Sequence, residues 1–123
     1  MGVRKVEDLI AWQLAGEFRD CVYALFNSSR EAKRDYRFRD QLFDSSSKLV
    51  GNISEGFYRN RTKEFLLFLS YARSSLGEAQ DWLRDGIARG YFTKAACEPA
   101  FRLAKRCGQA ILKLIESLKR FLD

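Results

Sequence analysis

Residues 52–83 read NISEGFYRNRTKEFLLFLSYARSSLGEAQDWL. The segment contains the end of one helical pattern, a short basic turn at residues 58–61 and the start of a long second helical pattern. Helices that are joined by so few residues must lie side by side and run in opposite directions. The segment therefore predicts an antiparallel pair of helices in the middle of the chain.

Apolar residues recur at spacings of three and four along the chain, which is the period of an amphipathic helix. The pattern shows no strand alternation and no repeat, and it predicts helices at about residues 7–26, 35–58, 63–89 and 94–122. We therefore predict one all-α domain over residues 1–123, an antiparallel up-down-up-down four-helix bundle. We expect the charged link at residues 30–35 to be a surface loop or a loose helix start, with Asp35 as N-cap.

A set of residues in the central segment forms a recognisable signature. Its members are Asn52-Ile53-Ser54-Glu55-Gly56, Arg59, Glu64-Phe65, Phe68-Leu69, Ala72, Ser74-Ser75-Leu76 and Glu78. The first predicted helix adds Asp8-Leu9, Trp12, Ala15 and Val22-Tyr23. Together they resemble the four-helix bundle protein family, also called the 23S rRNA intervening-sequence-encoded or S23 family. The resemblance implies a ring-shaped homopentamer, and it extends to accessory proteins of diversity-generating retroelements, which act beside a reverse transcriptase.

Composition excludes several classes of protein. The 123 residues are 46% hydrophobic and 14% aromatic, which favours a packed globule over disorder. The chain has no histidine, which excludes His-dependent catalytic triads, zinc sites with His ligands and the Glu-x-x-His motif of di-iron bundles. No apolar run reaches the ~18 residues of a membrane span, and acids replace the apolar part of a signal peptide.

The three cysteines are Cys21, Cys97 and Cys107, and no two of them have the CxxC spacing of a metal or redox motif. We expect them to be reduced core residues of a cytoplasmic protein. No nucleophile–base pair, phosphate-binding loop or metal-ligand cluster is visible. We therefore expect no cofactor, no metal, no membrane partner and no enzymatic activity.

Asn52 and Glu55 lie three residues apart on the second helix and share a face that is otherwise apolar. Arg59 follows Glu55 by four residues and can reach back to it. The favoured interpretation is a structural polar network that fixes helix pairing, and the alternative is a polar site inside the bundle.

The net charge is +6, and Lys and Arg are in excess in two segments, residues 30–63 and 94–122. Arginines beside aromatic residues suit phosphate contact with base stacking. The candidate nucleic-acid-binding residues are Arg34, Arg37, Arg39, Arg59, Arg61, Lys63, Arg102, Arg106, Lys113 and Arg120. The alternative is a set of solvated faces whose charge keeps the protein soluble.

Apolar residues outside the core stripes of the two middle helices predict contact between copies of the chain. Those in the second helix repeat every seven residues and would be exposed in a lone bundle. The predicted contact residues are Phe43, Val50, Phe57, Leu66, Leu67, Tyr71 and Trp82. The alternative is a thick core within one chain.

Two functions fit these features. The first is a non-enzymatic oligomeric scaffold that binds RNA or DNA through phosphates with low sequence specificity. The second is an adaptor whose basic surface docks an acidic protein partner, such as a reverse transcriptase or a ribosomal component.

Overall fold

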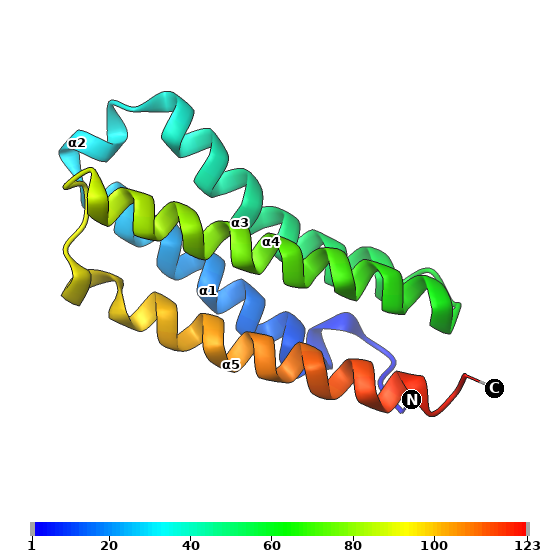
Figure 1. The fold of residues 1–123 in the computed structure, drawn as a ribbon. Helices are drawn as coiled ribbons and strands as arrows, with labels where there is room; N and C mark the ends of the chain where they lie inside the picture. The colour runs from blue at the N-terminus through cyan, green and yellow to red at the C-terminus, as the bar shows by residue number, and fades with distance from the viewer. Residues whose placement is uncertain (1, 123) are drawn as a thin grey trace.

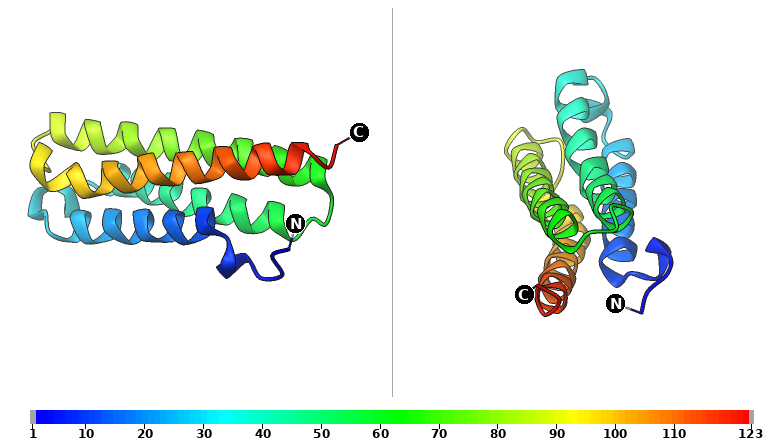
Figure 2. Two further views of the ribbon diagram at one scale, coloured as in Figure 1. Left: turned by 90° about the horizontal axis from the view of Figure 1, so that it is seen from below. Right: turned by 90° about the vertical axis from the view of Figure 1, so that its right-hand side faces the viewer.

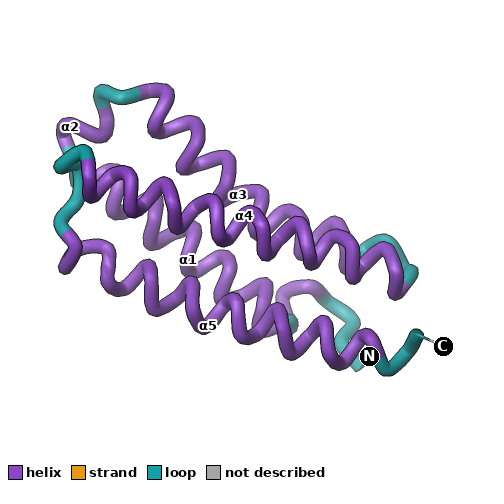
Figure 3. The backbone as a smooth tube through the Cα atoms, in the orientation of Figure 1, coloured by secondary structure: helices purple, strands orange, loops and turns teal. Residues whose placement is uncertain are grey.

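The computed structural model describes residues 2–122, which form an elongated bundle of helices (Figure 1). The elements are the 3-10 helix η1 (Val6–Asp8) and the helices α1 (Ile10–Asn27), α2 (Arg30–Lys33), α3 (Tyr36–Phe57), α4 (Thr62–Ala88) and α5 (Lys94–Lys119). The four long helices lie close to the predicted ranges, and the described residues include no strand. The prediction of an all-helical bundle is confirmed, and loops are confined to the links and the chain ends (Figure 3).

The long helices lie in the order α1, α3, α4, α5 around the bundle, and α5 closes it against α1 (Figure 2). Contacts between helices that are adjacent in the bundle join the start of one helix to the end of the other. The indole Nε1 of Trp12 in α1 donates a hydrogen bond to Ser54 Oγ near the end of α3, at 3.0 Å. The Arg84 guanidinium, late in α4, lies 5.4 Å from the ring centre of Phe101, early in α5. Neighbouring helices therefore run in opposite directions.

The pair α3 and α4 shares the most extensive contact in the bundle. A Cβ atom on Gly56, near the end of α3, would lie 2.8 Å from the Cβ of Phe68. A Cβ atom on Gly86, near the end of α4, would lie 2.6 Å from the ring of Phe92. Real Cβ atoms do not approach so closely. Gly56 therefore lets α3 approach α4, and Gly86 makes room for the buried ring of Phe92 in the link after α4.

The core runs along the bundle axis and contains side chains from every long helix. Its largest fully buried residues include Phe18, Phe38, Leu42, Leu49, Ile53, Leu69, Leu83 and Ile111. Among residues 2–122, every buried side-chain nitrogen and oxygen has a hydrogen-bond partner. No helix of the described range has both the length and the hydropathy of a membrane span.

The expectation that Phe43, Val50 and Phe57 would be exposed in a single chain is wrong. Val50 is only 7% exposed, and the Phe43 ring lies 4.6 Å from the ring of Tyr23 in α1. Phe57 is half-buried beside Phe65, at 6.1 Å between ring centres. The residues lie on the sides of α3 that α1 and α4 cover, so much of the apolar excess is explained within one chain.

The charged link at residues 30–35 is also more ordered than expected, because it contains the short helix α2. Ser29 Oγ accepts a hydrogen bond from the backbone N–H of Ala32 at 3.1 Å and caps this helix. Ala32 is fully buried and anchors the link to the core.

Gly56→Ala should lower the free energy of unfolding by about 1–3 kcal/mol, because the new methyl group collides with the Cβ of Phe68. Gly51→Ala in the same helix is the matched control. A Cβ there meets no atom within 4 Å, so the substitution should stabilise the protein by about 0.5–1 kcal/mol. Urea unfolding measures both changes, and equal effects at the two sites would contradict the close approach of α3 and α4.

Candidate nucleic-acid interface

Four basic residues lie on one exposed face along α5 and its C-cap, and we call them the α5 stripe: Arg102, Arg106, Lys113 and the C-cap Arg120. At about 3.6 residues per turn they fall within roughly 40° of one another around the helix axis, and they extend over about 27 Å. Arg102 pairs with Glu98 at 3.2 Å. The other three form no ion pair with any described residue. The α5 stripe is therefore a mostly uncompensated line of positive charge.

The opposite face of α5 fixes the orientation of the stripe. Thr93 Oγ1 accepts a hydrogen bond from the backbone N–H of Ala96 at 3.0 Å and caps the helix. Behind it, Cys97, Cys107 and Ile111 are fully buried. Because these small and apolar residues pack into the bundle, the basic residues on the other side of α5 must face solvent.

The buried cysteines are not candidates for nucleophilic or metal chemistry. Burial raises the pKa of Cys97 to about 11 and that of Cys107 to about 12, so both thiols are protonated at neutral pH. Within residues 2–122, no group of three or more His, Cys, Asp or Glu side chains could hold a metal ion.

A second basic cluster lies at the corner between α2 and α3. Arg34 and Arg37 are exposed there, beside Tyr36, which is 66% exposed. The Arg39 guanidinium lies 5.1 Å from the Tyr36 ring centre and pairs with Asp40 at 3.0 Å. Arg34 and Arg37 are thus free to meet an anion, whereas Arg39 is partly neutralised.

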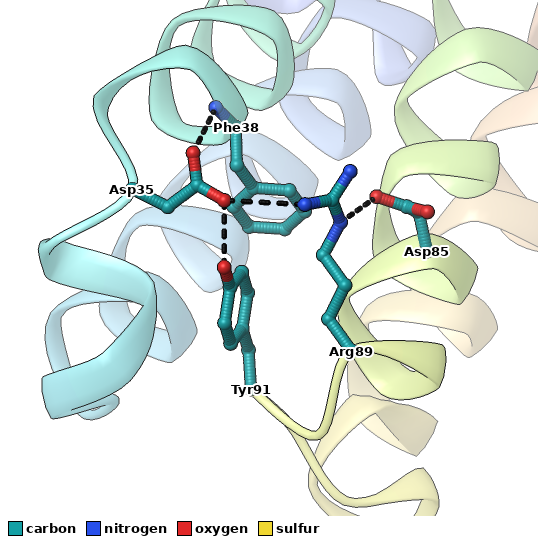
Figure 4. A network of polar contacts seen from close by, with 5 residues as sticks. All are labelled: Asp35, Phe38, Asp85, Arg89 and Tyr91. Carbon is teal, nitrogen blue, oxygen red and sulfur yellow. Dashed lines mark hydrogen bonds and ion pairs between the residues drawn. The ribbon is translucent and has the colours of Figure 1, made fainter.

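A polar network holds this corner against the link between α4 and α5 (Figure 4). Asp35 Oδ1 accepts from the backbone N–H of Phe38 at 3.0 Å, which confirms Asp35 as the N-cap of α3. Asp35 Oδ2 accepts from Tyr91 Oη at 2.6 Å and from Arg89 at 3.3 Å, and Arg89 also donates to Asp85 at 2.6 Å. The Tyr91 hydrogen bond, followed by the Phe38 N–H and the charge of Arg89, holds the pKa of Asp35 below its ordinary value.

The turn between α3 and α4 carries three of the predicted binding residues. Arg59 pairs with Glu55 at 2.7 Å, and Arg61 lies 3.6 Å from Glu64, so both charges have acidic neighbours. Lys63 is exposed and forms no ion pair with a described residue. This turn is therefore closer to neutral than its content of Lys and Arg suggests.

The expected place of Glu55 inside the bundle is wrong, because half of its side chain, 52%, is exposed. Asn52 is half-buried, and Glu55 lies at the exposed edge of the same face. Two polar contacts join the end of α3 to other helices: Arg59 pairs with both Glu55 of α3 and Glu64 of α4, at 2.7 and 3.7 Å, and Trp12 of α1 donates a hydrogen bond to Ser54.

The model of the 23S rRNA-intervening sequence protein family matches residues 7–113. The chain belongs to this family. A crystal structure of a protein with unknown function, from the S23 ribosomal protein family of Bacteroides thetaiotaomicron VPI-5482, has the same fold with a TM-score of 0.78. It shares 18% sequence identity, and the match covers 86% of this chain and 98% of that chain. A comparison with curated proteins gives no match.

In this member of the family, the ten predicted binding residues lie at three separate places. The α2–α3 corner and the α3–α4 turn lie at opposite ends of the bundle, and the α5 stripe runs between those ends (Figure 1). The ion pair between Arg102 and Glu98 was not predicted from the sequence, although a spacing of four residues on a helix is the usual signal for such a pair.

Asp35→Asn should lower the melting temperature by a few degrees at neutral pH, because the charge-assisted bonds to Tyr91 and Arg89 are lost. A carboxyl group with a lowered folded-state pKa stabilises the fold above its unfolded pKa, about 3.9, and loses this effect as pH falls through the folded value. The difference in melting temperature between Asp35→Asn and the wild type should therefore become smaller below about pH 3.9.

The control is Asp81→Asn, which removes an exposed partner of Arg84 within α4 and should change the melting temperature little. If the melting-temperature difference between Asp35→Asn and the wild type stays constant down to about pH 2, the charge of the Asp35 carboxylate does not have the proposed role.

Proposed function

We propose that this protein is a non-enzymatic scaffold that binds nucleic acid through phosphate contacts with low sequence specificity. The α5 stripe is the observation that carries the proposal. Three of its four residues lack an acidic partner among the described residues, and they follow one helix face for about 27 Å. The deep, narrow major groove of an RNA helix keeps side chains on a protein helix away from the base edges, so Lys and Arg there contact phosphates without sequence readout.

RNA is the first nucleic acid to test, because the family name refers to intervening sequences of 23S rRNA. We propose a cytoplasmic location, because a reducing compartment would keep its three free cysteines reduced.

Replacement of the α5 stripe by glutamine, at Arg102, Arg106, Lys113 and Arg120 together, should weaken binding to a hairpin RNA at least tenfold at about 100 mM salt. The slope of log affinity against log salt should also fall by about three, because each phosphate contact contributes about 0.7–0.9. Fluorescence anisotropy across a salt series measures both quantities.

The control variant replaces four basic residues on the other helices by glutamine, namely Arg19, Lys48, Arg73 and Arg84. It has the same net charge as the stripe variant but should keep most of the affinity and the slope. Equal losses in both variants would show that net charge alone governs binding. Absence of RNA binding, together with a stoichiometric acidic protein partner, would instead favour an adaptor function.

We further propose that copies of the chain assemble through the outer face of α4. Leu67 and Tyr71 are 48% and 46% exposed there, next to small exposed residues that allow another helix to approach closely. The small residues are Ser70, Ser74 and Gly77. The other predicted contact residues, Leu66 and Trp82 included, are at least half-buried within one chain. The resemblance to ring-forming proteins makes a homopentamer the expected assembly.

Light scattering should give a mass of about five chains for the wild type. Leu67→Lys with Tyr71→Lys should reduce the mass, since charged side chains oppose burial at a contact. Ile10→Lys, which changes a 65% exposed apolar residue at the start of α1, should leave the mass unchanged. A wild-type protein that scatters as a single chain would contradict the proposed assembly.

A further inference from the structure

A pocket of about 640 Å³ lies at the end of the bundle where three distant segments meet. The N-terminal segment, the α3–α4 turn and the end of α5 come together there (Figures 1 and 2). Its walls include Arg4 from the first segment, Tyr58 and Arg61 from the second, and Phe121 from the third. The volume lies within the range of small-ligand pockets, which is about 300–1,000 Å³.

The pocket lining is basic, and its described residues include no Asp or Glu. Arg4 forms no ion pair with any residue between 2 and 122. The Arg61 side chain is 82% exposed and shares Glu64, at 3.6 Å, with Arg59. Two guanidinium groups on different walls suit an anionic group with several oxygen atoms, above all a phosphate.

The same pocket offers two exposed aromatic rings. Tyr58 is 65% exposed and Phe121 is 57% exposed, although large apolar surfaces are usually buried. Exposed aromatic side chains beside arginines are the usual platform for stacking an unpaired base. The lining therefore combines the two chemistries of a nucleotide, a phosphate and a flat ring.

The position of the pocket links it to the α5 stripe. Arg120, the last residue of the stripe, directly precedes Phe121 in the pocket wall. We propose that the pocket receives an unpaired nucleotide at the end of an RNA whose phosphates lie along the α5 stripe. This inference rests on the proposed function. Paired bases stack on their neighbours in a duplex, so only an unpaired base can present its face to Tyr58 or Phe121.

The test compares the intact chain on two RNAs, a blunt hairpin and the same hairpin with a short single-stranded overhang. The wild type should bind the overhang RNA about tenfold more tightly at about 100 mM salt, the effect of stacking one base. Tyr58→Ala with Phe121→Ala should abolish this preference and leave the affinity for the blunt hairpin unchanged. Both side chains are largely exposed, so the fold should persist, and circular dichroism checks it.

Tyr36→Ala is the matched control, because Tyr36 is 66% exposed beside an arginine at the other end of the bundle. It should retain the overhang preference. Equal wild-type affinity for both RNAs, or loss of the preference in Tyr36→Ala, would overturn the pocket inference and leave the α5 stripe intact. Failure to bind either RNA would overturn the proposed function together with the pocket.

Discussion

The close approach of α3 and α4 is the constraint on which the rest of this bundle depends. A Cβ atom could not be accommodated at Gly56 or at Gly86, and these glycines lie at opposite ends of the helix pair. At Gly56 the close contacts are with Phe65 and Phe68 of α4, and at Gly86 they are with Phe92 in the α4–α5 link and Phe38 of α3. The pair is therefore tightly packed at both ends, next to the two links that follow from it. The α3–α4 turn is set at one end, and the α4–α5 link is fastened to the start of α3 by Asp35, Tyr91 and Arg89 at the other.

Once α3 and α4 are paired, the apolar faces that remain determine where α1 and α5 pack. α1 covers the side of α3 that carries Phe43, whose ring lies against Tyr23 and Phe26. α5 closes the bundle with a face of small and apolar residues that includes Cys97 and Cys107. The outer face of α5 is then fully available to solvent. Elsewhere on the surface most arginines lie beside an acid, as Arg59 lies beside Glu55. The α5 stripe differs because its largely uncompensated charges lie in line on one helix face, and this makes it the candidate binding surface.

Much of the fold could be predicted because the helices are amphipathic and their links are short. The 3.6-residue period placed the four long helices, and Asp35 was recognised as an N-cap from its position before an apolar pattern. Periodicity does not show which neighbour covers a side stripe, so the burial of Val50 and the outward position of Glu55 were both missed. Ala32 was not recognised as an anchor, because a single buried alanine leaves no periodic signal.

The candidate binding residues also divide into those that could be predicted from the sequence and those that could not. The α5 stripe could be predicted, because all of its members lie on one helix and their spacing fixes their common face. The pocket could not, because Arg4, Tyr58 and Phe121 are brought together only by the antiparallel arrangement of the long helices. No local pattern relates three segments that are separated by most of the chain. A site formed by distant segments can be recognised only in the tertiary structure, whereas a surface on a single helix can be predicted from the sequence.

The central claim is that nucleic acid binds along the outer face of α5. The most direct measurement is a titration of isotope-labelled protein with hairpin RNA, followed by the chemical shift of each backbone amide. The account predicts shift changes that follow the α5 stripe from Arg102 to Arg120 and spare the exposed face of α1 around Glu17 and Asp20. Shift changes that avoid α5, or that are spread evenly over the surface, would contradict it.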